Sequence, residues 1–363
     1  MILVGLNNLV ILAQNLIQPL MKPSLLNSTF GILFLLTLLS ATSCRKNDLK
    51  IITVTGEIPV SGMGVTLPNE HVLVDLASID SVGMNHYNRD SVIARVLPYF
   101  EELKQYKVKT FVDGTPKFMG RDPQLLAELS RKTGINIITN TGWYASDDER
   151  HLPKEINSMS AEEIAAVWID EAKNGIGNTG IKPGFIKIGL NKIQMSETDK
   201  KLVAAACLTH LETGLTIMSF TGPAQAAMDQ LTILKKYGVD PSAFIWSHAM
   251  EEPKSKKILT IALTGAWVAL DGIQNDMMSQ VQISNLLQNL KSTRQLNRIL
   301  LSHDAGWYQP GKPNGGEFRP YSELFSSFSL LLLSEGFTRK ELDQMIVKNP
   351  AEAFAVRVRK IAK

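Results

Sequence analysis

From about residue 60 onward, short β-rich runs alternate with longer helix-patterned stretches. Short runs bounded by turn residues are typical of strands, and longer periodic stretches are typical of helices. The strand segments predicted in this way are 71–75, 109–114, 136–142, 184–189, 215–222, 243–249, 266–272 and 298–306. The helical stretches predicted between and after them include 121–133, 160–173, 197–213, 223–237, 279–290 and 338–347.

This alternation predicts βα units built around a parallel sheet. Eight strands with intervening helices over roughly 300 residues are what a TIM (β/α)8 barrel requires, so we expect a single barrel domain over residues 61–363. A doubly wound open sheet is the alternative, but no Gly-x-Gly-x-x-Gly turn follows the first strand. The Gly/Pro-rich and aromatic segment 303–321 is predicted to be a long loop after the last strand.

The first 43 residues differ from the rest, with one charged side chain, Lys22, and two apolar runs. The second run, 30–42, is too short to span a bilayer comfortably, which takes roughly 20 residues. It is typical of the hydrophobic region of a secretory signal. Because Lys22 gives a positively charged opening after Met21, the chain starts at either Met1 or Met21.

Small residues precede Cys44 in "SATSC", and the polar "RKND" follows. This pattern resembles the lipobox of bacterial lipoproteins, in which the cysteine is lipidated and becomes the mature N-terminus. The resemblance implies a signal peptide over 1–43, cleaved before Cys44, and a linker and N-terminal segment over 44–60. It also implies a lipid-anchored protein of the bacterial cell envelope, periplasmic or at the outer surface. An uncleaved membrane anchor helix is the alternative.

The amino-acid composition is that of an ordinary globular protein. The 38 basic and 35 acidic residues give a formal net charge of +3 without a long basic run, so no nucleic-acid partner is indicated. After lipidation of Cys44, Cys207 would remain as the single thiol, and its helical surroundings predict a buried core residue. A small molecule is therefore the expected partner, together with the membrane through the lipid.

Polar residues at the predicted strand ends are the candidates for chemistry, because a barrel builds its active site there. Asn69 and His71 stand two residues apart and so share one strand face. Lys187 lies inside the apolar run "FIKIG", where a lysine is costly unless it is paired or bound to a metal. His248 and Asp304 close the sixth and eighth strands.

These strand ends resemble those of the phosphotriesterase family of the amidohydrolase superfamily. Further blocks follow the family's order to about residue 357, among them "GVTLPNEH", "IKPGFIKIG", "LETGLTIMSFTGPA", "ILLSHDAGWY" and "IVKNPAEAF". The resemblance implies two divalent metals, usually zinc, bridged by a carboxylated lysine and a hydroxide, and barrels of this family often form homodimers. By position, it implies four metal ligands: His71, Lys187, His248 and Asp304.

The chain departs from the family at two positions. Asn69 stands where the family has the first histidine of its pair, and Phe220 stands where it has a fifth-strand histidine. Catalytic zinc typically has three protein ligands and an open position. The first metal position keeps three ligands, with the Asn69 carbonyl oxygen as a fourth: His71, Lys187 and Asp304. The second position keeps only Lys187 and His248. The count therefore favours one zinc ion over two.

The resemblance implies that Asp304 carries a proton toward the leaving group, and that His248 orients water or substrate. Aromatic residues near the strand ends are predicted to wall the substrate pocket: Trp143, Tyr144, Phe220, Trp307 and Tyr308. We predict a hydrolase of a carboxylic ester, lactone or phosphoester that uses metal-activated hydroxide. The alternative is a catalytically inactive, membrane-anchored barrel that binds a small ligand, with Lys187 and Asp304 forming a salt bridge without metal.

Overall fold

The computed structural model describes residues 49–77, 87–146, 148–190 and 194–362. The predicted signal peptide and Cys44 lie outside the described residues, and their roles remain predictions. No helix within the described ranges has the length and apolar character needed to cross a membrane.

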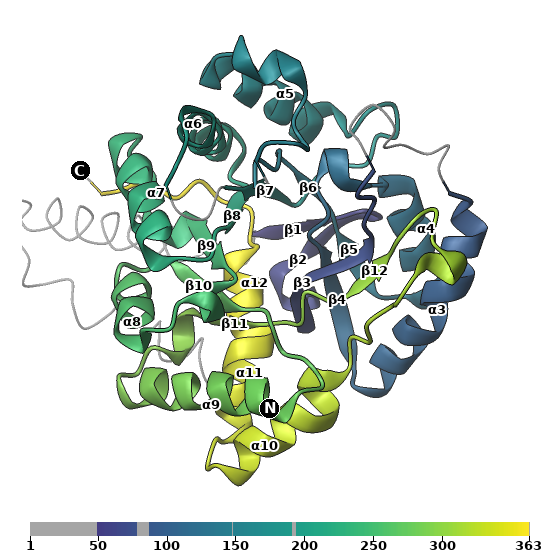
Figure 1. Cartoon of the computed structure of the whole chain (residues 1–363), viewed down its shortest axis with the longest axis vertical. Helices are drawn as coiled ribbons and strands as arrows, with labels where there is room; N and C mark the ends of the chain where they lie inside the picture. Colours follow the sequence, from purple (N-terminus) through teal and green to yellow (C-terminus); the bar gives the residue numbers. More distant parts are fainter. Residues whose placement is uncertain (1–48, 78–86, 147, 191–193, 363) are drawn as a thin grey trace, which may run out of the picture. The chain divides into compact units, whose positions relative to one another are not determined.

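Parallel strands alternate with helices and form a TIM (β/α)8 barrel (Figure 1), as predicted. The strands pair in the orders β11-β10-β9-β8-β7-β6 and β12-β3-β4-β5. Their bounds are β3 Val65–Leu73, β4 Val108–Asp113, β5 Asn136–Ile138, β6 Asn140–Thr141, β7 Phe185–Gly189, β8 Thr216–Phe220, β9 Phe244–Ser247, β10 Trp267–Leu270, β11 Ile299–Leu301 and β12 Gly306–Tyr308. The first strand therefore begins at Val65 rather than at residue 71, and the predicted loop 303–321 contains β12.

Helices follow the strands and surround the barrel (Figure 1). Their bounds are α3 Arg89–Gln105, α4 Pro123–Thr133, α5 Ala161–Asn174, α6 Glu197–Thr213, α7 Ala224–Lys236, α8 Ser255–Leu263, α9 Met277–Ser292, α10 Ser329–Ser334, α11 Arg339–Asp343 and α12 Asn349–Ala353. The last predicted helix, 338–347, is divided between α11 and a π-helical turn at Gln344–Lys348.

Local capping residues explain why helix starts could be predicted closely. At α5, the Ser160 side chain accepts a hydrogen bond from the Glu163 backbone N–H, and the Glu163 carboxylate accepts one from the Ser160 N–H. Ser196 and Asp199 form the same reciprocal pair at α6. Asp122 caps α4 by accepting from two backbone N–H groups of its first turn.

The sequence predicts a linker over 44–60, but part of this segment is folded. β1 (Lys50–Thr53) and β2 (Gly56–Pro59) form an antiparallel hairpin. Ile51 is fully buried in the same apolar cluster as the barrel interior, and Val54 donates its backbone N–H to Ile137 at 2.8 Å. The prediction is corrected because apolar burial ties this hairpin to the barrel domain.

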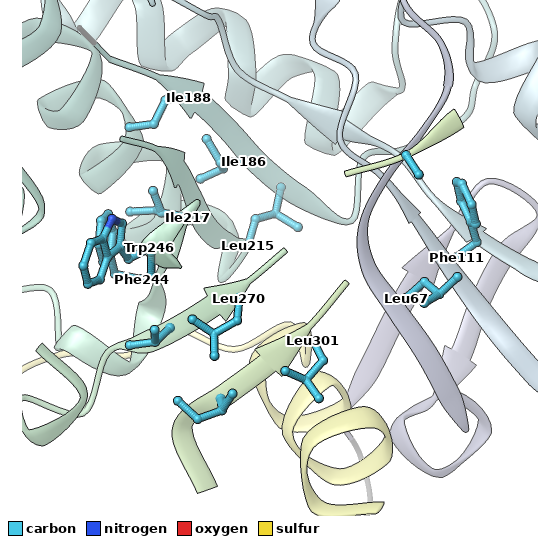
Figure 2. Packing of buried hydrophobic residues seen from close by; sticks show 14 of the residues in the cluster. Leu67, Phe111, Ile186, Ile188, Leu215, Ile217, Phe244, Trp246, Leu270 and Leu301 are labelled. Atoms are coloured by element: carbon cyan, nitrogen blue, oxygen red, sulfur yellow. The ribbon is translucent and has the colours of Figure 1, made fainter. Parts of the chain in front are cut away.

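Strand side chains divide between two apolar layers. Those facing the helices include Ile186 and Ile188 of β7 and Ile217 of β8 (Figure 2). The barrel interior is filled by a second cluster that includes Phe185, Met218, Ile245, Ala269 and Leu300. Two positions further along the same strands stand Lys187, Phe220, Ser247, Asp271 and Ser302. Because side chains alternate with a period of two, a polar layer lies above the apolar residues that fill the barrel interior. Phe220 is the apolar member of this otherwise polar layer.

An irregularity in β3 turns its polar pair into the barrel. The register of β3 against β4 shifts between Leu67 and Glu70, and Leu67 belongs to the same apolar cluster as the helix-facing residues (Figure 2). Without this shift, Asn69 would share the outward face of Leu67 by simple alternation. The bulge thus lets Asn69 and His71 face the interior while Glu70 points outward.

Candidate active site

The polar layer opens into one cavity of about 240 Å³ at the carboxyl ends of the strands. Its ionisable lining residues are His71, Lys187, His248, Glu251 and Asp304. Its apolar wall includes Val74, Pro116, Met119, Tyr144, Phe220 and Trp307. TIM barrels place their active sites on this face, so the cavity is the candidate active site.

Asp304 lies between the two predicted histidine ligands. Its Oδ1 is 2.9 Å from Nε2 of His71, and its Oδ2 is 3.6 Å from Nε2 of His248. Asp304 and His248 both adopt left-handed backbone conformations, with φ of 53° and 60°. Such conformations are strained for residues other than glycine and are often found at functional sites. His248 directly follows β9 and Asp304 lies in the turn between β11 and β12, and both side chains line the cavity.

The hydrogen bond that Nδ1 of His71 makes determines whether Nδ1 carries a proton. Nδ1 is 2.8 Å from the Thr115 hydroxyl, which donates its own proton to the Leu73 carbonyl at 3.0 Å. The hydroxyl must then accept from Nδ1–H, which leaves a lone pair on Nε2 of a neutral ring. Without a further proton on the ring, Nε2 of His71 and Oδ1 of Asp304 would be two facing acceptors. A proton or a metal cation between them stabilises this arrangement.

Lys187 stands at the floor of the cavity and is 3% exposed. Its ammonium donates to Oδ1 of Asn69 at 3.1 Å and lies 3.4 Å from Sδ of Met218. Burial lowers the pKa of Lys187, and the surrounding carboxylates, Asp271 foremost, oppose this only in part. Among the described residues, the ion pairs of Asp304 are with histidines, so the lysine–aspartate salt bridge of the metal-free alternative is not formed.

Asp271, at the end of β10, fixes the orientation of Asn69. Its Oδ2 accepts from Nδ2 of Asn69 at 2.8 Å and from the Ser247 hydroxyl at 2.6 Å, and its Oδ1 accepts from the His248 backbone N–H at 2.8 Å. Because a carboxylate only accepts, the amide nitrogen of Asn69 must face Asp271. The amide oxygen is then directed at Lys187 and serves as its acceptor.

Neighbouring groups lower the pKa of Asp304 and raise the pKa of His248. Burial raises the pKa of Asp304, but the hydrogen bond and charge of His71 outweigh it, so the pKa lies below its ordinary value. Burial lowers the pKa of His248, yet the carboxylates of Asp271, Glu251 and Asp304 outweigh it, so the pKa lies above its ordinary value. The pair therefore favours an anionic aspartate beside a cationic imidazole.

The structure brings some of the predicted pocket residues together and leaves others aside. Three aromatic residues line the cavity: Tyr144, Phe220 and Trp307. Trp143 instead packs edge-on against Trp168 at 5.9 Å, because successive residues of an extended segment point to opposite faces. Tyr308 lies outside the cavity wall, with its ring packed over Gly315. Trp143 and Tyr308 are therefore removed from the predicted pocket.

Sequence reasoning missed several residues of the site. Asp271 closes the predicted strand "AWVALDG", and a carboxylate at a barrel strand end could have marked it. Gly114 follows the second strand, and a β-carbon there would lie 2.5 Å from Oδ1 of Asn69, so only glycine permits this approach. Thr115 lies in a loop and Glu251 in the short 3-10 turn Ala249–Glu251, and no local pattern marked them.

We expect Asp271→Asn to disturb the site without unfolding the barrel. A carboxamide has one acceptor oxygen for the three donors that converge on Asp271, so one of them is left opposite an amide N–H. Outer-shell changes of this kind typically cost about 10–100-fold in activity or metal affinity. Steady-state kinetics and metal analysis would measure the loss, with Asp276→Asn at the start of α9 as a control. An unchanged kcat/KM would contradict the role given to Asp271.

No three His, Cys, Asp or Glu side chains form a preformed metal site within the described ranges. The pairwise spacing nevertheless suits a divalent ion, since tetrahedral ligands with bonds of about 2.0–2.1 Å lie roughly 3.3 Å apart. The two imidazole–carboxylate distances at Asp304, 2.9 and 3.6 Å, bracket this value. Imidazoles and a carboxylate are also ordinary ligands of divalent metals, so the chemistry of the donor set is compatible with such an ion.

The fold and the strand-end cluster define a TIM-barrel enzyme architecture, and the comparisons with known proteins agree. The sequence matches the Phosphotriesterase family over residues 49–354. It is 30% identical over 293 residues to the phosphotriesterase homology protein of Escherichia coli K12, which covers 80% of this chain and 98% of that protein. It is 29% identical over 309 residues to an aryldialkylphosphatase of Saccharolobus solfataricus, covering 81% and 95% of the two chains.

Solved structures give the same result. The organophosphorus hydrolase of Deinococcus radiodurans superposes with a TM-score of 0.77 at 26% identity, over 86% of this chain and 98% of that one. This chain belongs to the Phosphotriesterase family. Enzymes of this family use divalent metals and hydrolyse ester or phosphoester bonds.

Proposed function

We propose that this barrel hydrolyses a carboxylic ester, lactone or phosphoester with a single zinc ion. His71 and Asp304 would hold the ion, with Lys187, once carboxylated, as the third ligand. The observation that carries the proposal is the 2.9 Å approach of Nε2 of His71 to Oδ1 of Asp304, a gap that calls for a proton or a metal cation between the two atoms. Nε2 of a neutral His71 and Oδ1 of Asp304 would each supply a ligand to the ion.

When bound, the metal polarises the substrate oxygen and lowers the pKa of water. The remaining steps fall to side chains of the cavity. Asp304 accepts a proton from the attacking water, and His248, beside its other oxygen, donates one toward the leaving group. The carboxylates of Asp271, Glu251 and Asp304 raise the pKa of His248, which supports this acid role.

We propose that Lys187 has two states, a carboxylated one and an uncarboxylated one. Taking up carbon dioxide would convert its buried amine to an anion and remove the cost of an ammonium in the barrel. Its oxygens would then be available to the ion. In the uncarboxylated state, the Asn69 oxygen supplies the acceptor that the ammonium needs.

Phe220 is the reason for proposing one ion rather than two. Its ring lies edge-on to His248 with the centroids 4.5 Å apart, and it also contacts Tyr144 at 5.4 Å. An apolar ring supplies no ligand at this strand end. The same ring would suit a ligand-binding barrel without catalysis, which is the second candidate function.

Metal content and turnover separate these candidates. Protein from residue 45, prepared with zinc and bicarbonate, is expected to hold about one equivalent of metal and to turn over aryl esters, lactones or organophosphates. Asn69→His with Phe220→His is expected to raise occupancy toward two, because both family imidazoles return. Asn285→His, at an exposed position of α9, controls for chelation by an added histidine.

Two outcomes would contradict these proposals. Metal-free protein without turnover on any of the three substrate types would favour the ligand-binding barrel. Unchanged occupancy in the double variant would show that these two strand ends do not form a second metal position.

A further inference from the structure

The hairpin formed by β1 and β2 closes the end of the barrel opposite the cavity. A β-carbon at Gly184, the residue before β7, would collide with the Ile52 carbonyl, so the hairpin lies at the amino end of that strand. The Lys50 carbonyl accepts the backbone N–H of Val356, in the C-terminal tail 354–362, at 2.9 Å. The described chain therefore begins at the amino ends of the strands, whereas the cavity opens at their carboxyl ends.

Three exposed lysines stand at this end of the barrel. Lys109 lies at the start of β4, Lys182 lies in the turn before β7, and Lys360 lies in the C-terminal tail. None of the three forms an ion pair with another described residue. Their charge is therefore available to a partner.

The carboxylates at this end do not neutralise these lysines. Glu57 is paired with Lys50 at 2.6 Å, and Glu352 is paired with Arg357 at 3.3 Å. Asp240, in the turn before β9, is half-buried and accepts the Ser242 backbone N–H at 2.9 Å. The exposed surface at this end is consequently basic.

Helix dipoles account for only some of the basic residues here. The helices of a barrel end on this side, and cations such as Lys173 of α5 and Lys236 of α7 favour the last turn of a helix for that reason alone. Lys109, Lys182 and Lys360 are not in the last turn of any helix. Their positions therefore call for another explanation.

Exposed apolar side chains are found at the same end. Leu263, at the end of α8, is 64% exposed, and Val358 and Ile361 in the C-terminal tail are 43% and 38% exposed. Lysines beside exposed apolar side chains suit the surface of an anionic membrane, because the ammonium groups attract the headgroups while the apolar groups enter the interface.

The predicted lipid on Cys44 would be attached close to this surface. Four residues, 45–48, separate Cys44 from Leu49, and an extended chain across this interval spans at most about 18 Å. A single lipid chain binds a membrane only weakly, so stable anchoring takes a second signal such as a basic surface. The position of the tether and the charge therefore favour the same partner.

Resting on this predicted lipid, we propose that an anionic phospholipid bilayer binds the basal face of the barrel, which comprises Lys109, Lys182, Leu263, Val358, Lys360 and Ile361. The cavity, at the opposite end, then opens away from the bilayer. Its substrate reaches it from the aqueous side and is a soluble molecule rather than a membrane lipid. The orientation does not depend on which bond the barrel hydrolyses.

Protein from residue 45 lacks the lipid site and keeps the whole basal face, so vesicle sedimentation measures this face alone. We expect it to bind vesicles that contain phosphatidylglycerol and not vesicles of phosphatidylcholine alone, and to be released as salt is added. Lys109→Gln combined with Lys182→Gln and Lys360→Gln is expected to lower the partition coefficient by about tenfold or more.

The matched control removes the same charge at the cavity end. Lys154→Gln combined with Lys254→Gln and Lys312→Gln changes three exposed lysines in the segments that follow the strands, and should leave vesicle binding as in the wild type. Equal losses in the two triple variants would overturn the proposal, as would equal binding of the wild type to both kinds of vesicle.

Fluorescent labels test the orientation without removing any charge from the basal face. Cys207 is fully buried, and burial raises the pKa of its thiol to about 12, so a thiol introduced at the surface reacts selectively. A polarity-sensitive label on Val358→Cys is expected to shift to the blue on phosphatidylglycerol vesicles, and one on Lys312→Cys is not. A shift at Lys312→Cys, or no shift at Val358→Cys, would overturn the proposed orientation.

Mass spectrometry of the mature protein tests the lipid on Cys44 separately. If Cys44 is unmodified while the lipid-free protein still binds through the basal face, the predicted anchor fails and the basal face stands. If Cys44 carries lipid but the lipid-free protein binds no vesicles, the basal face fails and the anchor stands.

Discussion

Asp304→Asn is expected to lower kcat/KM by about a thousandfold on whichever ester the wild type cleaves, because it removes the proposed proton acceptor and a metal ligand. Asparagine suits the position, since it tolerates the left-handed backbone at φ 53° better than other residues except glycine. The backbone contacts of residue 304 also remain, including its N–H donation to the Asn69 carbonyl at 3.1 Å.

The same substitution has an unusual expected effect on stability. A carboxamide nitrogen can donate to Nε2 of a neutral His71, which replaces the hydrogen bond between Oδ1 of Asp304 and this ring. The attraction of the carboxylate to His248 is lost. The metal-free variant is therefore expected to melt close to the temperature of the metal-free wild type, so that a large loss of activity accompanies little loss of stability.

Kinetics, metal analysis and thermal melting together test this prediction. Asp343→Asn, at an exposed aspartate of α11, should behave like the wild type in all three measurements. Retention of full kcat/KM by Asp304→Asn would exclude Asp304 from catalysis. A large loss of melting temperature would instead show that the aspartate mainly supports the fold.

The largest stability effect is expected at Glu70, a fully buried carboxylate on the outer face of β3. Its Oε1 accepts from the Ser302 hydroxyl at 2.7 Å, and from the backbone N–H and Nδ1 of His303 at 2.9 and 2.6 Å. Its Oε2 accepts from the Ala305 N–H at 2.8 Å. These bonds bind the turn that carries Asp304 to the first strand.

Glu70→Gln is expected to lower the free energy of unfolding by about 3 kcal/mol, because an amide nitrogen replaces a charged acceptor among buried donors. Thermal and denaturant unfolding would measure the loss. Activity should fall as well, since the turn that positions Asp304 loosens. Glu128→Gln, with a 38% exposed carboxylate, is the matched control. Equal stability of the two variants would contradict the role of Glu70.

His303 shows why local sequence separates function from support poorly. It adjoins Asp304, yet the two side chains point in opposite directions along the chain. His303 is 1% exposed, pairs with Glu70 and accepts the Leu324 backbone N–H on Nε2 at 2.9 Å. Its neighbour Asp304 faces the cavity. Strand alternation predicts this division, but it does not identify the partners.

The sequence alone determined the barrel and the order of its elements, because strand and helix periodicities are local and capping signals lie next to the helices they begin. It also placed the polar residues at the strand ends. It did not determine that the hairpin at 50–59 belongs to the barrel, or that Trp143 and Tyr308 lie away from the cavity.

Only the tertiary structure decided how the site is arranged. His71 and Asp304 are 233 residues apart in the chain, and Asn69 and Asp271 are 202 apart. Closing the barrel brings these pairs within hydrogen-bonding distance, and the donors and acceptors available there fix the orientation of each side chain. A local pattern specifies which residues reach the rim, but their protons and partners depend on neighbours that the closed barrel supplies.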